Sequence, residues 1–348
     1  MTFTRRGKWT AVASAVLVLA VAAALIVAIT GKGPAFIQQA VVKVGLADPP
    51  PPPTCPLTGE PAPHGVIPHR PVLAVKVENL PEARPQAGLQ AADIVYEEPV
   101  EGGITRFIVL FQCHDADRVG PVRSGRTTDP GILVQYGKSL LAYAGGANEV
   151  VRAIDRAGLI DVNYVAAAKA YVRDPNRLPP HNLYASTKKL YAAGKSKEGT
   201  PSPAFTYDPD VPDKSRRGGE VHLDFSSYSD VYWRWDRRDG VWYRSHGDVP
   251  HTIEDGDQVS AANVVVQVVD VQPGSIIDAA GNPSPEVRLT GSGKAYVFRD
   301  GRMIVGKWIR DTIDDVTEFV RRAGQEIPLA PGRTWIELLP ASIRVQVA

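Results

Sequence analysis

Net charge is nearly absent from this 348-residue sequence, because 39 lysines and arginines offset 38 aspartates and glutamates. Without a bulk positive charge to attract phosphates, the composition gives no indication of nucleic-acid binding, and any partner must be recognised by a local cluster. The 30 prolines amount to nearly twice the average usage of about 5%, which disfavours long helices and an all-α fold. The hydrophobic content of 44% is enough for buried cores and excludes a disordered chain.

The motifs of several common enzyme classes are missing. The sequence has no serine nucleophile elbow and no Gly-x-Gly-x-x-Gly fingerprint, and residues 291–294 lack the spacing of a phosphate-binding loop. Seven histidines and two cysteines do not form a zinc pattern, because His64 and His69 have no third ligand at a recognised spacing. We therefore expect no resident cofactor and no metal site.

Charged side chains are also absent from residues 9–30. A helix of roughly 22 residues spans about 33 Å, enough to cross the hydrocarbon core of a bilayer. Because Arg5, Arg6 and Lys8 precede this run, the positive-inside rule predicts that residues 1–8 are cytoplasmic and that the chain after residue 30 is extracytoplasmic. The alternative is a cleaved secretory signal, whose apolar core is usually shorter, about 7–15 residues. We expect an uncleaved, single-pass anchor in the cell membrane.

Residues 31–54 are predicted to form a proline-rich stalk. They include five consecutive prolines, residues 49–53, which favour a stiff polyproline II spacer of about 3.1 Å per residue. A lipid anchor at Cys55 is disfavoured, because the apolar run ends far upstream and Pro53 and Thr54 precede the cysteine. The stalk is expected to hold the remaining chain away from the membrane.

The only two cysteines, Cys55 and Cys113, both follow the predicted anchor. In an oxidising extracytoplasmic compartment such a pair is a candidate disulfide. Two independent thiols are the alternative, but both would be open to oxidation there. We therefore expect a disulfide bond.

Two regions of different secondary structure follow the stalk. Residues 55–200 alternate strands with helices, which predicts an α/β or α+β fold. On the expected helix that begins after Asn148, the side chains of Val150, Val151 and Ile154 are expected to share one face. The expected strands are residues 72–77, 93–96, 105–111 and 139–144, and the expected helices are capped by Asn148 and Ser186 and end at Gly158 and Gly194.

Residues 201–348 are predicted to form a mainly β C-terminal module. Two strand pairs are joined by short turns, 231–235 with 241–244 and 295–298 with 302–305, and residues 263–269 are typical of a buried strand. The tryptophans of the first pair are predicted to pack within the hairpin, and a glycan-binding face with two neighbouring arginines is the alternative. These side chains are Trp233, Trp235 and Trp242, with Arg234 and Arg244.

Short motifs follow one another along most of the chain after the stalk. They lie at residues 55–59, 78–79, 83–89, 92–97, 101–107, 119–126, 180–184 and 332–336. Together they resemble the YerB-like family of bacterial envelope proteins, a domain of unknown function with a C-terminal β-rich module. The resemblance implies an envelope location and this two-part architecture, but no reaction. Members of that family are typically lipoproteins, whereas this sequence predicts a helical anchor.

The densest polar cluster lies in residues 118–129, where three arginines fall within nine positions beside accessible glycine amides. Such a loop can hold a phosphate, pyrophosphate or carboxylate. A proline-fixed loop adds His181, a candidate proton shuttle for which a structural hydrogen bond is the alternative. The predicted ligand-binding set is Arg106, Arg123, Ser124, Arg126, Asp129, His181 and Asn182.

Asp93, Glu97 and Glu101 form the acidic candidate set. Clustered carboxylates can bind a metal or serve acid/base chemistry. The favoured interpretation is that they form salt bridges with Arg106, Arg123 or Arg126. In that case part of the arginine loop would be structural.

These features favour a membrane-anchored protein that binds an anionic envelope glycan, lipid or protein partner through the loop around Arg123. The alternative is a transferase similar to the LytR-CpsA-Psr phosphotransferases. That similarity implies arginines that hold a lipid-linked pyrophosphate, with Mg²⁺ neutralising its charge. Its candidate residues are Asp93, Arg123, Arg126, Asp129 and residues 143–146. We favour binding, because the sequence assembles neither a catalytic triad nor a metal set.

Overall fold

The computed structural model describes residues 21–22, 30, 32, 34–43, 51–195, 198–211, 215–278, 280–321 and 323–348. The chain divides into two compact units, Met1–Pro52 and Pro53–Ala348. In the first unit the structure describes helix α2 (Ala35–Lys43), within the predicted stalk. No helix among the described residues is long and apolar enough to cross a membrane. The predicted anchor, residues 9–30, lies almost wholly outside them and stays a prediction.

A mixed sheet forms the centre of the larger unit, with 11 strands among the described residues. Strand β20 runs parallel to both of its neighbours, β14 and β2, so strands from both predicted regions belong to one sheet. The order is β19 (Glu318–Val320), β18 (Arg302–Arg310), β17 (Gly291–Arg299), β14 (Asn263–Val269), β20 (Thr334–Pro340), β2 (Ile94–Pro99), β3 (Thr105–Phe111), β1 (Leu73–Glu78), β4 (Leu140–Ala142) and β5 (Ile160–Asp161), with β8 (Arg216–Arg217) paired to β18.

The central strands are covered on both faces. Every residue of β1 and of β3 is buried, as their nearly continuous apolar sequences predict. Alternate side chains therefore enter two separate cores: Val75 and Val109 lie in one, and Ala74 and Ile108 lie in the other. A charged residue in such a strand must be buried as well.

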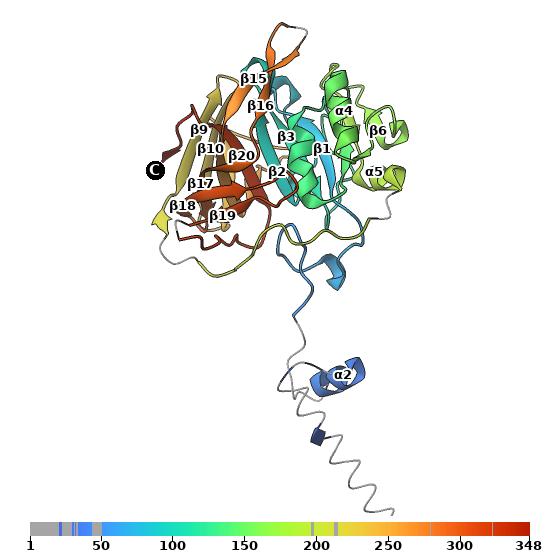
Figure 1. The fold of residues 1–348 in the computed structure, drawn as a ribbon, viewed down its shortest axis with the longest axis vertical. Coiled ribbons are helices and arrows are strands. Elements are labelled where there is room, and N and C mark those ends of the chain that lie inside the picture. The colour runs from blue at the N-terminus through green and yellow to red at the C-terminus, as the bar shows by residue number, and fades with distance from the viewer. Residues whose placement is uncertain are drawn as a thin grey trace, which may run out of the picture. The chain divides into compact units, whose positions relative to one another are not determined.

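A smaller sheet packs over one face of the large sheet (Figure 1). Trp233 of the smaller sheet meets Trp335 of β20 edge to face, with ring centroids 5.2 Å apart. Trp233 and Trp242 are fully buried, so they form no exposed aromatic face, while Trp235 is partly buried and packs on Trp242 within the hairpin. This sheet contains β12 (Val249–Pro250), β11 (Val241–His246), β10 (Ser229–Asp236), β9 (Glu220–Ser226) and β21 (Gln346–Val347), with β13 (Ser260–Ala261) paired to β11.

Short helices and two strand pairs complete the unit. Helix α4 begins one residue after its N-cap, Ala147, and not after Asn148 as predicted. Val150 and Ile154 are buried, but Val151 is 43% exposed, because its place in the turn directs it away from the core. Ser186 is confirmed as the N-cap of α5, although its side chain makes no capping hydrogen bond. The α-helices are α3 (Thr128–Leu133), α4 (Asn148–Arg156) and α5 (Thr187–Gly194), and the strand pairs are β15 (Val271–Ile277) with β16 (Pro283–Val287) and β6 (Tyr171–Arg173) with β7 (Leu183–Ala185).

Six 3₁₀ turns occur among the described residues and cover the connections between these elements: η1 (Pro63–Gly65), η2 (Pro81–Ala83), η3 (Leu89–Ala91), η4 (Glu101–Gly103), η5 (Val134–Tyr136) and η6 (Ala168–Ala170).

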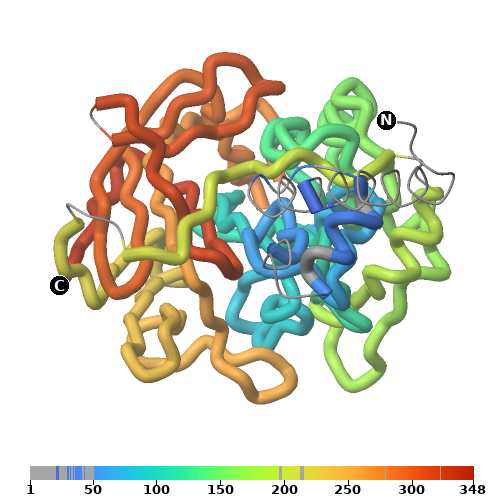
Figure 2. Tube along the Cα trace, turned by 90° about the horizontal axis from the view of Figure 1, so that it is seen from below, coloured from blue at the N-terminus to red at the C-terminus, as the bar shows by residue number. Residues whose placement is uncertain are grey.

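The two predicted regions lie side by side, joined by a surface segment. Figure 2 shows residues 198–211, in yellow-green, crossing from the α5 side to the β-rich side. Phe205 anchors this segment by packing on Phe319. The observed architecture confirms a mixed α/β N-terminal part followed by a β-rich C-terminal part.

Candidate functional site

The pairing of β1, β2 and β3 creates a row of charged side chains on one face of the large sheet. Arg106 of β3 lies directly opposite Glu78 of β1 and Glu98 of β2. Directly paired residues share a face of the sheet, and residues two apart on a strand do so too, so Lys76 belongs to the same row. The sequence prediction missed Lys76, although a lysine inside an otherwise apolar strand indicates a buried charge.

Lys76, Glu98 and Asp129 form a fully buried ionic group between this face and α3. The Lys76 ammonium lies 2.8 Å from Oδ1 of Asp129 and also forms an ion pair with Glu98. Burial raises the pKa of Glu98 to about 7; Lys76 opposes this shift, and the charge of Asp129 adds to it. One oxygen of Glu98, Oε2, has no hydrogen-bond partner within the described part of the chain.

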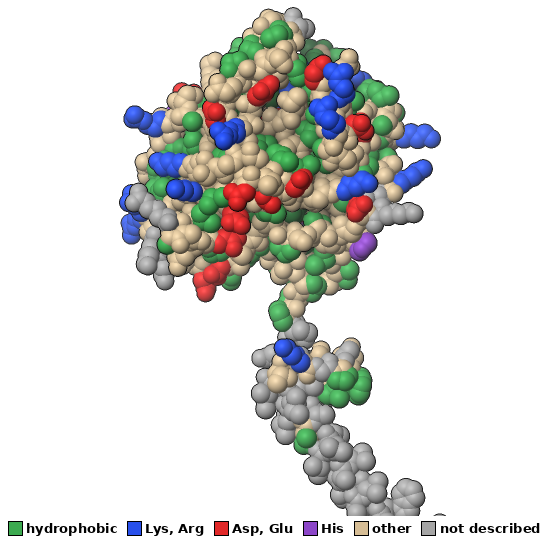
Figure 3. All heavy atoms as spheres, viewed as in Figure 1, with side chains coloured by type: hydrophobic (Ala, Val, Ile, Leu, Met, Phe, Trp, Pro, Cys, Tyr) green, Lys and Arg blue, Asp and Glu red, His purple; other side chains and the backbone are tan. Residues whose placement is uncertain are grey.

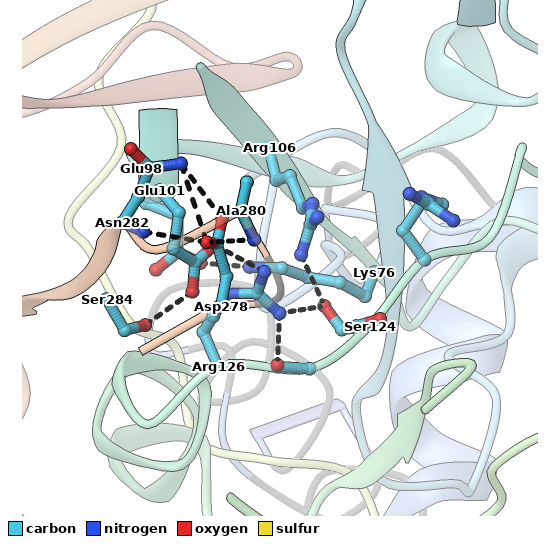
Figure 4. Close-up of polar contacts among 12 residues, drawn as sticks. Lys76, Glu98, Glu101, Arg106, Ser124, Arg126, Asp278, Ala280, Asn282 and Ser284 are labelled. Carbon is cyan, nitrogen blue, oxygen red and sulfur yellow. Dashed lines mark hydrogen bonds and ion pairs between the residues drawn. The ribbon is translucent and has the colours of Figure 1, made fainter. Parts of the chain in front are cut away.

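Arg126 is held by Glu101 at the end of the same row. Its Nε donates to Oε2 of Glu101 at 2.9 Å, and Ser284 of β16 donates to the other carboxylate oxygen at 2.6 Å (Figure 4). The backbone N–H of Arg126 donates to Asp129 at 2.8 Å. Burial raises the pKa of Glu101, but the hydrogen bonds from Arg126 and Ser284 outweigh it and the net shift is downward. The predicted salt bridge to Glu101 is therefore present.

Glu78 joins Arg123 to His181. Its two oxygens lie 3.1 Å from Nε of Arg123 and 2.9 Å from Nδ1 of His181. The Arg123 contact is an ion pair without hydrogen-bond alignment, because both of its buried atoms lack a hydrogen-bond partner. The arginine loop is fixed against β1 by the N–H of Arg123, which donates to the Lys76 carbonyl at 2.9 Å.

Arg106 is the cation of this row without a carboxylate partner. Its side chain is buried, and Nη1 donates to the Ser124 carbonyl at 3.1 Å, an oxygen that also accepts from Arg126 at 3.3 Å. No ion pair of Arg106 occurs among the described residues. Burial, followed by the charges of Arg126 and Arg123, lowers the pKa of Arg106 to about 10. We call Arg106, Arg123 and Arg126 the arginine cluster; its guanidinium groups repel one another.

A cavity of about 250 Å³ adjoins Arg126, and Arg106 and Arg123 lie beside Arg126 but do not line this cavity. Ser124, Arg126 and Glu101 line it, and the β15–β16 hairpin forms the facing wall with Ile276 and Ser284. His181 lines a different hollow of about 650 Å³, together with Arg84 and Arg177. His181 is therefore linked to Arg123 through Glu78, but it does not share the cavity of Arg126.

Three predicted site residues lie elsewhere. Asn182 accepts from Arg173 at 2.8 Å and fixes the loop before β7. Asp93 lies beyond the opposite end of β2, where its carboxylate contacts His114. Glu97 points to the other face of the sheet and pairs with Arg244, because successive strand residues alternate between faces. The set required by the phosphotransferase alternative is thus divided, although residues 144–145 do contact the arginine loop.

The described residues contain no group of three or more histidine, cysteine or acidic side chains placed to hold a metal ion. The disulfide between Cys55 and Cys113 is confirmed, with Cα atoms 5.9 Å apart.

Comparison with known proteins gives matches that span both parts of the larger unit. The family model "Protein of unknown function (DUF3048) N-terminal domain" matches residues 57–200, and the corresponding C-terminal domain matches residues 221–336. A protein of Bacillus subtilis (strain 168) named "Putative lipoprotein YerB" is 32% identical over 307 residues, which cover 82% of this chain and 86% of that protein. The crystal structure of YerB from Bacillus subtilis matches with a TM-score of 0.72 at 27% identity, covering 84% of this chain and 99% of that one.

Proposed function

This chain belongs to the YerB-like family of DUF3048 proteins, and from that premise we propose that it is a membrane-anchored, extracytoplasmic protein that binds an anionic ligand of the cell envelope. The arginine cluster is the proposed binding site. The ligand class is a phosphate- or carboxylate-bearing group, whose oxygens match the donors of guanidinium groups.

The extracytoplasmic location rests on three observations. The related Bacillus subtilis protein carries the name of a lipoprotein. The disulfide between Cys55 and Cys113 is a bond that persists in oxidising compartments. The uncharged run at residues 9–30 follows three basic residues, the charge pattern of an anchor with its N-terminus in the cytoplasm. Lipidation and a spanning helix are two ways to reach the same location.

The unpaired charge of Arg106 carries the binding proposal. Arg123 and Arg126 each have a carboxylate partner, whereas Arg106 is buried beside them and, among the residues that the structure describes, has only a carbonyl oxygen as acceptor. A buried cation without a counterion is costly, and here two neighbouring cations add to that cost. An oxyanion placed between Arg106 and Arg126 would accept the unused N–H donors and reduce the repulsion. The arrangement therefore favours anion binding over a purely structural role.

The surroundings limit the size and nature of the ligand. A cavity of about 250 Å³ admits one charged headgroup, and Ile276 and Ile277 give it an apolar wall on one side. The face shown in Figure 3 carries its basic side chains mainly at the flanks, with acidic side chains between them. We therefore propose a local contact between the arginine cluster and one anionic group of the ligand, and not a broad electrostatic attraction to a polyanion.

Arg106→Gln tests the site. The full chain in detergent is titrated with inorganic pyrophosphate and with succinate. In a second experiment the chain is sedimented with vesicles of phosphatidylglycerol or of phosphatidylcholine. Binding to the anionic vesicles would identify a lipid headgroup as the ligand, and binding to the soluble probes alone would identify a free anion. We expect the variant to weaken anion binding by roughly tenfold or more, the value of a charge-assisted hydrogen bond. Its melting temperature should not fall, because the substitution removes an unpaired buried charge and keeps a donor near Ser124.

Arg152→Gln is the matched control, because Arg152 is an exposed arginine of α4 that forms a surface ion pair with Glu149. It should bind every probe like the wild type. Equal affinity of the wild type and Arg106→Gln would remove the arginine cluster as the site, and so would a wild type that binds none of the probes.

A further inference from the structure

A second cavity, of about 500 Å³, lies where the N-terminal and C-terminal parts of the larger unit meet. It is near Asp93, at the opposite end of β2 from the arginine cluster. Its walls are formed by Glu60, residues 90–92, 114–115, 240–241, 260–262 and 331–333. Cavities that bind small molecules commonly measure about 300–1,000 Å³, so this one has a suitable size.

Asp93 holds His114 at the wall of this cavity. The buried carboxylate lies with Oδ1 2.6 Å from Nδ1 of His114, while Oδ2 accepts from the backbone N–H groups of Gln112 and Cys113. Because a carboxylate oxygen accepts hydrogen bonds, Nδ1 of His114 is the donor in this contact, which fixes the ring. The hydrogen bond to Asp93 raises the pKa of His114, against the effect of burial. Among the described residues, Nε2 of His114 has no partner, and the side chain is 38% exposed.

Arg333 brings a guanidinium group to the same wall without a counterion. Its Nε donates to the Ala92 carbonyl at 3.0 Å, and Nη1 donates to Gln90 at 3.2 Å and to the Ser260 carbonyl at 2.9 Å. These acceptors are neutral, and no ion pair of Arg333 occurs in the described part of the chain. Burial lowers the pKa of Arg333 to about 10, so the group is still charged at neutral pH. The three acceptors fix its plane and leave Nη2 available.

Glu60 supplies the opposite charge. Its carboxylate lines the cavity and has neither a hydrogen bond nor an ion pair among the residues that the structure describes. It acts on Arg333 and His114 through space, since its charge raises the pKa of both. Asp115, the other acid of the wall, is already occupied by Arg70 at 3.1 Å and Thr187 at 2.8 Å. The cavity therefore has one positive group, Arg333, with the His114 imidazole on the same wall, and one free negative group.

We propose that this cavity binds a small zwitterion, such as a free amino acid or a short peptide, with its carboxylate on Arg333 and His114 and its ammonium group on Glu60. A ligand with only a negative charge would leave Glu60 unpaired and would repel it. A ligand with only a positive charge would likewise leave Arg333 unpaired and would repel it. A ligand with both charges satisfies both groups at once. This site is independent of the arginine cluster and adds to the proposed function.

The test is a calorimetric titration of the full chain with alanylalanine in its L,L and D,D forms. The N-acetylated dipeptide lacks the ammonium group, and the dipeptide amide lacks the carboxylate. We expect the unmodified dipeptide to bind, and each blocked analogue to bind roughly tenfold or more weakly, because each loses a charge-assisted contact. Failure of the wild type to bind either dipeptide at millimolar concentrations would overturn the proposal.

Two variants test which residue of the protein binds which charged group of the dipeptide. Arg333→Gln should lose binding of the unmodified dipeptide by roughly tenfold or more. Glu60→Gln changes a partly exposed side chain, so folding is expected to be retained; it should weaken the unmodified dipeptide but leave the N-acetylated analogue unchanged. If Glu60→Gln lost the same affinity for the unmodified and the N-acetylated dipeptide, Glu60 would not bind the ammonium group. If the wild type bound blocked and unmodified dipeptides equally well, neither charge of the ligand would be recognised.

The two sites are tested separately in the same preparations. Arg106→Gln should retain dipeptide binding, and Arg333→Gln should retain pyrophosphate binding. Loss of both ligands in either variant would mean that the two cavities do not act as independent sites.

Discussion

Arg244 lies with Nη2 2.6 Å from Oε2 of Glu97, and both side chains are fully buried between the two sheets. Glu97 belongs to β2 and Arg244 to β11, so this ion pair links the N-terminal part of the chain to the β-rich part. Thr105 and Ser229 also donate to Glu97, at 2.6 and 3.0 Å. Burial raises the pKa of the neighbouring Glu337 well above its usual value, and the charge of Glu97 adds to this, so Glu97 carries the negative charge.

Arg244→Gln is expected to lower the free energy of unfolding by about 3–5 kcal/mol, because it leaves the Glu97 carboxylate buried without its counterion. The double variant Glu97→Gln, Arg244→Gln should recover part of this loss, since it removes both charges. Urea unfolding measures both values. The matched control is Arg234→Gln, which removes a partly exposed pair with Glu220 and should cost at most about 1 kcal/mol. A double variant less stable than Arg244→Gln would contradict this explanation.

The position of Glu97 shows where sequence reasoning reached its limit. Asp93, Glu97 and Glu101 formed a single acidic set in the sequence, and the strand was expected to end at residue 96. In the structure β2 continues to Pro99, so Glu97 and Glu98 point to opposite faces and enter different networks. An acidic run can be assigned to one site only when the end of the strand is known.

Local patterns were more reliable than long-range pairing. The hairpins, the buried strands β1 and β3, and the disulfide follow from short sequences or from residue chemistry. The insertion of β20 between β14 and β2 joins residues that are far apart in the chain, and no local signal indicates it. The cavity beside Arg333 depends on this insertion, and for that reason the sequence did not reveal it.

Removal of the disulfide is expected to destabilise the fold without changing its topology. The bond closes a loop with a sequence separation of 58 residues, for which the chain-entropy relation gives about 4 kcal/mol. The variant Cys55→Ser, Cys113→Ser should therefore unfold at lower urea concentration. Intact mass with and without reductant should differ by two hydrogen atoms for the wild type, because reduction of the bond adds two electrons and two protons. Two thiols alkylated in the native, unreduced protein would contradict the bond.

Membrane retention should depend on residues 9–30. Leu17→Arg together with Leu19→Arg places two charges in the uncharged run, each costing about 2.5–3.5 kcal/mol at the centre of a spanning helix. We expect the wild type to remain in the membrane fraction after alkaline washing and the variant to be lost from it. Gln38→Arg together with Ala40→Arg places the same two charges outside the run and serves as the control. Equal retention of the two forms would indicate a different attachment.

The raised pKa of Glu98 predicts how stability changes with pH. Its folded pKa of about 7 exceeds the ordinary value of 4.5, so the folded state binds this proton more tightly than the unfolded state does. The contribution of Glu98 to stability is therefore fully present below about pH 4.5 and falls as the pH rises toward 7, by on the order of 1 kcal/mol per pH unit at most.

Glu98→Gln removes this contribution and leaves Lys76 paired with Asp129 at 2.8 Å. The free energy of unfolding of the variant minus that of the wild type should rise between pH 4.5 and 7, while the surface control Glu149→Gln gives a flat difference. Groups that do not contact Glu98, including the buried His251 whose pKa is lowered, cancel in this subtraction. A flat difference for Glu98→Gln would therefore show that folding does not raise the pKa of Glu98.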